Sequence, residues 1–238
     1  MADPQDLLIP VHADPLQYPL PHFAERLALK GAVKIVAIGS SSTAGDGGIA
    51  PYPERLQEML RQTYRNSQID VINKGVGGEE APDELRRMQA VIDEKPALTI
   101  WQIGTNAVWK DQNLDEVDMA VKAGLYLLKS QPMDVILMDI QYAPAILTDN
   151  GSGRRAACCR SSPRRTANVG VFRRFDMMRK FVEIERRSFD VLIDPGDDKR
   201  LHESDMVSGR IGYELCRAIA VAATVASPDA APPGGLIF

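Results

Sequence analysis

Short apolar runs alternate with amphipathic stretches along most of this chain. Four runs rich in β-branched or large apolar residues have the length and composition of buried parallel strands. A shorter run predicts a fifth strand. The five runs cover residues 33–38, 69–72, 98–103, 135–138 and 169–172.

Between these runs, apolar residues recur at the spacing of one helical face. Strands that alternate with amphipathic helices indicate right-handed crossovers and a parallel sheet covered on both faces. The pattern therefore predicts an α/β protein, a flavodoxin-like three-layer α/β/α sandwich with a five-stranded parallel sheet. The predicted helices cover 53–64, 114–128, 175–185 and 211–222, and another begins near Glu80.

The length of 238 residues favours one domain, since α/β domains often exceed about 200 residues without dividing. We expect this domain over residues 32–226. Residues 1–31 hold five prolines and little periodicity, which predicts an extended arm. Residues 227–238 predict a disordered tail.

A net charge of −4 gives no general attraction to nucleic acid or anionic lipid, and nucleic acid is not expected as a partner. The first twenty residues lack a basic leader and a long apolar run, which argues against a secretory signal or a membrane span. We therefore expect a cytoplasmic protein, and its oligomeric state is left open. The arginine-rich stretch 150–168 contains no acidic residue and predicts a solvated or disordered loop.

The chain contains three cysteines, too few for a disulfide framework, and the adjacent Cys158 and Cys159 lack the spacing of a zinc site. No metal or organic cofactor is expected. The chain also contains three histidines, of which His202 alone lies outside the amino-terminal arm.

Three loops that follow predicted strands carry candidate chemistry. Ligands of an open parallel sheet bind beyond the carboxyl ends of the strands, because the connecting loops diverge there. Ser41 lies directly between the first strand and a helix, which suits a nucleophile. Gly78 allows a backbone amide to approach a carbonyl oxygen, and Asn106 offers a side-chain amide. Together with the Ser41 amide, these groups predict an oxyanion hole.

A serine hydroxyl needs a base, and imidazole suits neutral pH. His202 lies just before the last helix and can reach the same edge of the sheet. Asp198 or Asp197 could orient its ring, and we take Asp198 as the partner. Trp109 and Tyr142 lie in or near strand-end loops and are candidates for binding the substrate.

Three segments resemble sequence blocks of the SGNH or GDSL-type serine esterases. The first block is matched by 39–45, the glycine block by 73–78, and the Gly-x-Asn block by 104–106. The resemblance runs from about Val33 to Pro144 and resumes weakly towards Tyr213. It implies a nucleophile and first oxyanion donor at Ser41, further donors at Gly78 and Asn106, and a base at His202.

The last block departs from the family pattern, which has an aspartate three residues before the histidine. Lys199 occupies that place, and Asp198 and Asp197 lie one and two residues further back.

The sequence thus predicts a serine hydrolase that cleaves a small carboxylic ester through an acyl-enzyme intermediate. The acyl chain, the alcohol, and the choice between hydrolysis and acyl transfer are left open. One alternative is an SGNH-like module that binds an acyl or sugar ligand without catalysis. Another is a flavodoxin-like protein that binds phosphate at the turn after the first strand.

Overall fold

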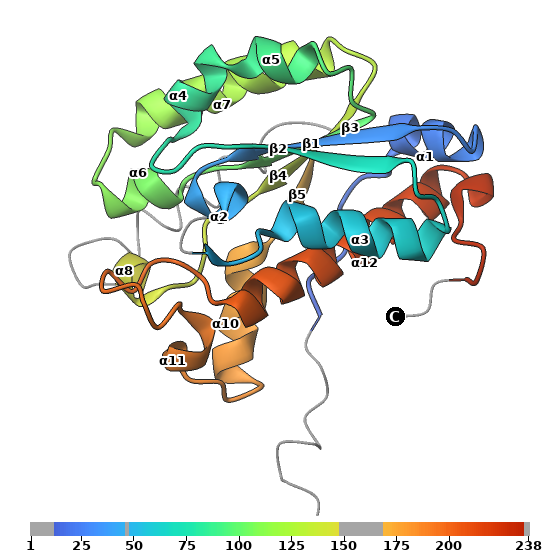
Figure 1. Ribbon diagram of the computed structural model, residues 1–238. Coiled ribbons are helices and arrows are strands. Elements are labelled where there is room, and N and C mark those ends of the chain that lie inside the picture. The colour runs from blue at the N-terminus through green and yellow to red at the C-terminus, as the bar shows by residue number, and fades with distance from the viewer. Residues whose placement is uncertain (1–11, 46–47, 148–168, 236–238) are drawn as a thin grey trace, which may run out of the picture.

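The computed structural model describes residues 12–45, 48–147 and 169–235. Its five parallel strands form one sheet in the order β2-β1-β3-β4-β5, with helices on both faces (Figure 1). The α/β/α sandwich expected from the sequence is confirmed. The strands are β1 (Val33–Gly39), β2 (Ile69–Gly75), β3 (Leu98–Gln102), β4 (Asp134–Met138) and β5 (Gly170–Phe172).

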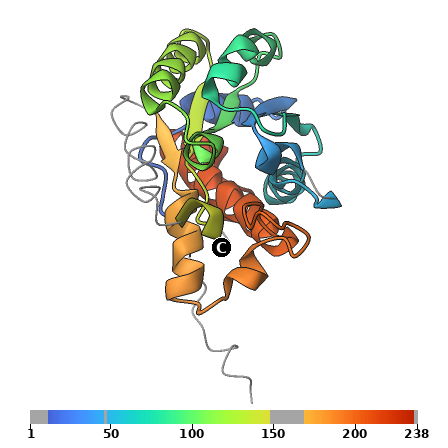
Figure 2. The same ribbon diagram turned by 90° about the vertical axis from the view of Figure 1, so that its left-hand side faces the viewer.

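Each face of the sheet buries one apolar stripe of its covering helices, and the layers are separated in Figure 2. One face is covered by α1 (Pro21–Ala28), α3 (Tyr52–Tyr64) and α12 (Asp205–Ala226). The other face is covered by α4 (Ala81–Arg86), α5 (Met88–Ile92) and α7 (Leu114–Lys129).

Short helices follow the carboxyl ends of three strands and lie at one end of the molecule (Figure 1). They are α2 (Ser41–Ala44) after β1, α6 (Thr105–Trp109) after β3 and α8 (Pro144–Leu147) after β4. The remaining elements are α10 (Arg174–Glu183), α11 (Phe189–Leu192) and the 3₁₀ turn η4 (Pro228–Ala230). Among the described helices, none is both long and apolar enough to cross a membrane.

The amino-terminal segment differs from the expected extended arm. Pro21 begins α1, and Phe23, Ala24 and Leu27 are buried against the sheet. The carboxylate of Asp134 accepts the Phe23 amide at 2.8 Å and so satisfies a first-turn donor of α1. A proline in the first turn followed by apolar residues at helical spacing was the sequence signal for this helix.

The carboxy-terminal segment also differs from the expected disordered tail over the residues that are described. The η4 turn follows α12, and Ala230 is buried in the same core as α1. The predictions for 150–168, Cys158 and Cys159 lie outside the described residues.

One close approach limits the packing of α7 on the sheet. Trp101 of β3 is fully buried, and its ring lies so close to Gly124 that a Cβ atom there would clash with it. A side chain at position 124 would therefore displace either the indole or the helix.

We predict that Gly124→Ala lowers the free energy of unfolding by about 1–3 kcal/mol, because the added methyl group overpacks this contact. Gly209→Ala in α12 is the matched control, since its new Cβ would meet only ordinary contacts with Arg55. The control should be neutral or stabilising by about 0.5–1 kcal/mol, because alanine favours the helix. Urea denaturation measures both, and equal stability of the two variants would contradict the packing argument.

Candidate active site

The parallel sheet brings the ends of three neighbouring strands to one edge. β1 lies between β2 and β3, with Gly39 opposite Gly75 and Ile38 opposite Trp101. The loops that carry the candidate oxyanion donors and the nucleophile leave the sheet at these positions. Their convergence follows from the strand order.

The turn after β1 fixes Ser40 and presents Ser41. Ser40 is 2% exposed, and both its amide and its hydroxyl donate to Gln102 Oε1, at 3.0 and 3.1 Å. The next residue, Ser41, begins α2 and is partly exposed. Thus Ser40 ties the turn to β3, while its neighbour Ser41 faces the site.

His202 lies between Ser41 and Asp197. Its Nε2 is 3.1 Å from Ser41 Oγ, and its Nδ1 is 3.0 Å from Asp197 Oδ2. The choice of Asp198 as the partner was wrong, because Asp198 is exposed and Asp197 makes the contact. A tight turn, in which the Arg200 amide donates to the Asp197 carbonyl oxygen, brings residue 197 back to the ring.

Backbone amides also stabilise the Asp197 carboxylate. Its Oδ2 accepts the amides of Leu201 and His202, each at 2.7 Å, and its Oδ1 accepts that of Lys199 at 3.2 Å. Burial acts to raise the pKa of Asp197, but these hydrogen bonds and the charge of His202 outweigh it and hold the pKa below its ordinary value. The ionised carboxylate can therefore orient the imidazole at neutral pH.

The two other candidate oxyanion donors lie in the loop after β2 and in the first turn of α6, and these segments contact each other. Gly78 has a φ of +82°, a conformation that favours glycine, and its carbonyl oxygen accepts Lys110 Nζ at 2.7 Å. Asn106 is buried and donates from Nδ2 to the Glu79 carbonyl oxygen at 2.7 Å. An amide nitrogen carries two N–H groups, so this bond orients the side chain and leaves a second donor for a ligand.

Glu80 supports these loops, and sequence reasoning missed it by treating it as an ordinary helix-start acid. It is 2% exposed, and its carboxylate accepts the amides of Gly104 and Ala107 at 2.7 and 2.9 Å. Burial raises the pKa of Glu80, and the amide hydrogen bonds act against this rise. The carboxylate thereby joins the glycine loop to the start of α6.

A second buried acid lies one helical turn further on. Glu84 accepts the Trp101 indole N–H at 2.6 Å. Burial, together with the charge of nearby Glu80, raises the pKa of Glu84 well above its ordinary value.

Trp109 and Tyr142 lie beside the histidine loop. The Trp109 ring is 5.2 Å from Lys199 Nζ, measured to the ring centroid. Tyr142 packs between Phe175 and Phe189, with centroid distances of 5.1 and 5.4 Å. Both belong to an apolar cluster outside the main core, and their role in binding substrate stays a prediction.

A cavity of about 20 Å³ adjoins the candidate nucleophile, room for about one water molecule or methyl group. Its lining is mixed, and the described residues around it are Ser41, Ser42, Gly45, Ile49, Pro51, His202, Glu203 and Ser208. Within the described ranges, no three histidine, cysteine, aspartate or glutamate side chains are placed to hold a metal ion.

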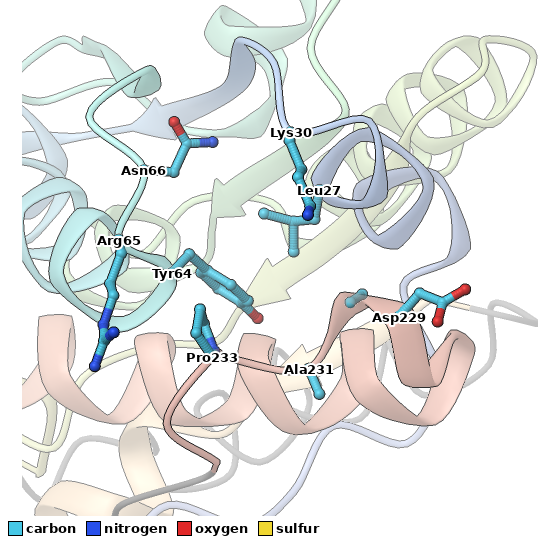
Figure 3. Close-up of a pocket in the computed structure, with 9 residues that line it drawn as sticks. Leu27, Lys30, Tyr64, Arg65, Asn66, Asp229, Ala231 and Pro233 are labelled. Atoms are coloured by element: carbon cyan, nitrogen blue, oxygen red, sulfur yellow. The ribbon is translucent and has the colours of Figure 1, made fainter.

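A larger cavity of about 340 Å³ lies at the other end of α3, beside the end of α1 and η4 (Figure 3). Lys30 and Tyr64 point into it, whereas the Arg65 side chain turns away. Its described lining contains no serine, cysteine or histidine, so acyl-transfer chemistry of the kind described above is not expected there.

The fold is that of the SGNH or GDSL-type hydrolases, with a five-stranded parallel sheet between helices and a histidine that contacts both a serine and an aspartate at its carboxyl end. The chain matches the Non-GDSL lipase-like family over residues 9–225 and belongs to that family. The resemblance to SGNH and GDSL-type carboxylic ester hydrolases expected from the sequence is thereby confirmed.

Solved structures share the fold at low sequence identity. One is a catalytic mutant of Axe2, an acetylxylan esterase from Geobacillus stearothermophilus, with a TM-score of 0.61 and 21% identity. The match covers 79% of this chain and 95% of that one. Another is a member of the lipolytic protein G-D-S-L family from Veillonella parvula DSM 2008, with a TM-score of 0.61 and 15% identity, over 77% and 96% of the two chains.

A curated relative corrects the expected location. A segment of 80 residues is 32% identical to the uncharacterized lipoprotein YqeF of Bacillus subtilis (strain 168). The match covers 32% of this chain and 33% of YqeF, so the chain spans about a third of that relative in the alignment. The similarity to a lipoprotein contradicts the cytoplasmic location expected from the start of the chain, and that prediction was wrong.

We predict that Asp197→Asn lowers kcat for ester hydrolysis on the order of 10²–10⁴-fold, because the amide cannot hold the imidazole in the same tautomer. Asp198→Asn is the matched control and should keep the activity of the unchanged protein, since Asp198 is exposed. Steady-state kinetics with a chromogenic acetyl ester tests both variants. A larger loss in the Asp198 variant would reverse the assignment.

Proposed function

We propose that this protein is a serine esterase that hydrolyses a small carboxylic ester, with Ser41 as nucleophile, His202 as base and Asp197 as the group that orients the base. The observation that carries the proposal is the unbroken line of contacts from Ser41 Oγ through the imidazole to the Asp197 carboxylate, at 3.1 and 3.0 Å. These three groups are within the reach that proton transfer requires.

In the first half of the reaction, Ser41 Oγ attacks the ester carbonyl carbon while His202 Nε2 takes the hydroxyl proton. The tetrahedral intermediate collapses as the C–O bond to the alcohol breaks, and His202 returns the proton to the leaving alkoxide. This step leaves the acyl group on Ser41. Water then attacks the acyl-enzyme with the same base, releasing the acid and restoring the serine hydroxyl.

The negative charge that develops on the carbonyl oxygen needs donors already in place. We assign this role to the backbone amides of Ser41 and Gly78 and to the Asn106 side-chain amide. Loss of one such donor costs about 3 kcal/mol of barrier in comparable sites. The Asn106 bond to Glu79 supports this assignment, because it fixes the amide before substrate binds.

The similar structures support the same set of residue types. Three Axe2 structures are described as catalytic mutants, and in them a serine, a histidine or an aspartate is replaced by alanine. Axe2 is an acetylxylan esterase, and this, with the small cavity beside Ser41, favours an acetyl group as the acyl part of the substrate.

The two alternatives are less well supported. A binding module without catalysis would not need His202 to lie within hydrogen-bonding distance of both Ser41 and a carboxylate. In this structure His202 lies within that distance of both groups. A phosphate site at the turn after β1 would gain from a lysine following that turn. The sequence from Gly39 to Tyr52 contains no lysine.

We predict that Ser41→Ala lowers kcat for acetyl ester hydrolysis on the order of 10⁴-fold or more, because the variant cannot form the acyl-enzyme. Ser130→Ala, at an exposed helix end, is the control and should be fully active. A fluorophosphonate probe followed by peptide mapping should label Ser41 alone. Retained hydrolysis by pure Ser41→Ala protein would reject the mechanism.

We further predict that kcat/KM falls by about tenfold or more between acetyl and octanoyl esters of the same alcohol, since the cavity beside Ser41 has room for about one methyl group. The two esters should be compared below their micellar concentrations. Equal values for the two acyl groups would show that the acyl chain occupies some other surface.

A further inference from the structure

The residues that follow Ser41 and His202 contact each other as well. Ser42 Oγ donates to Glu203 Oε2 at 2.8 Å, one residue along from the 3.1 Å contact between Ser41 Oγ and His202 Nε2. Two successive residues of α2 thus bind two successive residues of the histidine loop. Two contacts fix both the distance and the direction between two segments, whereas one contact allows rotation about itself.

Glu203 is buried, with 5% of its surface exposed, and lies in the field of a buried cation, Arg174. Burial lowers the pKa of the Arg174 guanidinium, and the charges of Glu203 and Asp139 oppose this effect. Arg174 also donates to Thr105 Oγ1 at 3.1 Å, next to the candidate oxyanion donor Asn106. The Glu203 carboxylate therefore accepts the Ser42 hydroxyl and interacts favourably with the nearby Arg174 charge.

Gln141, just beyond the end of β4, provides a second tie on the other side of His202. Its Oε1 is 3.2 Å from Ser42 Oγ, and its Nε2 donates to the Leu201 carbonyl oxygen. Glu203, which follows His202, is thus joined to Ser42 directly. Leu201, which precedes His202, is joined to Ser42 through the Gln141 side-chain amide. The polar groups in this network are buried or partly buried, and such networks fix geometry when their members are satisfied.

The histidine loop also has backbone contacts that do not involve the Glu203 side chain. The Asp194 amide donates to the His202 carbonyl oxygen at 2.9 Å, and the Ser204 amide donates to the Leu192 carbonyl oxygen at 2.8 Å. These bonds would remain after loss of the carboxylate. The loop would then stay near the site but hold the ring less firmly.

We propose that Glu203 and Ser42 are positioning residues for the reaction: their contact aligns the His202 imidazole with the Ser41 hydroxyl. The inference rests on the proposed function of Ser41 and His202. Neither positioning residue exchanges a proton with the substrate. Their contribution is to keep Nε2 within proton-transfer reach of Oγ, where a displacement of about 1 Å can cost up to about 100-fold in rate.

The test is a double-mutant cycle with Ser42→Ala, Glu203→Leu and the double variant, measured as kcat and KM for an acetyl ester. We expect each single change to lower kcat about tenfold, with KM changed by less than about twofold, because ground-state binding does not need the aligned base. The double variant should fall little further than either single variant, since both remove the same contact. Glu203→Gln, which keeps an acceptor oxygen, should retain most of kcat.

Titration with the fluorophosphonate probe separates positioning from stability. A merely structural role would lower the fraction of protein that is labelled but leave kcat per labelled site unchanged, and that result would overturn the proposal. Glu214→Gln is the matched control, because Glu214 of α12 is fully buried away from Ser41. Its carboxylate binds Arg217 and the Ala13 amide. It should keep the kcat of the unchanged protein.

Three further outcomes decide the matter. If Glu203→Leu does not fold because Arg174 has lost its carboxylate, Ser42→Ala carries the test, and unchanged kcat in that variant overturns the proposal. Losses that multiply in the double variant would show two independent effects and would also overturn it. If the unchanged protein neither hydrolyses acetyl esters nor is labelled at Ser41, the proposed function fails instead.

Discussion

The carboxylate of Asp197 is the group on which the candidate site depends. By accepting the amides of Lys199, Leu201 and His202, it folds a loop that has little regular structure of its own. The same oxygen that receives two of these amides also contacts the imidazole. The shape of the loop and the orientation of the ring are therefore set by one ionised group, which a neutral side chain could not replace in both respects.

Around this loop, buried acids connect segments that the sheet alone would leave separate. Glu80 joins the loop after β2 to the start of α6, and Glu203 joins the histidine loop to α2. Each carboxylate is costly to bury, and each is compensated by several donors or a nearby cation. The parallel sheet places the loop ends roughly, and these acids determine their final geometry.

Much of the fold could be predicted because strand and helix patterns are local. The five strands follow from short apolar runs, and Ser41, Gly78 and Asn106 follow from their place after adjacent strands. The partner of His202 could not be chosen correctly, because the difference between Asp197 and Asp198 lies in a turn that spacing does not reveal.

Other features escaped for related reasons. Helix α1 was overlooked because prolines dominated the amino-terminal composition, although its apolar spacing was helical. The burial of Glu80, Glu84 and Glu203 depends on tertiary contacts, and acids near helix starts are usually exposed. The cytoplasmic location was inferred only from the lack of a basic leader and a long apolar run in the first twenty residues, and the similarity to a lipoprotein contradicts it.

The position of α12 has a consequence for the order of events during synthesis. This helix follows the histidine loop directly, and its buried Glu214 and its Ala222 carbonyl oxygen receive the amides of Ala13 and Leu20. The ribosome therefore synthesises the five strands before it synthesises α12, the helix that binds the segment of Ala13 and Leu20. A nascent protein that already has all five strands still lacks His202, so the proposed site can assemble only after the histidine loop has been synthesised.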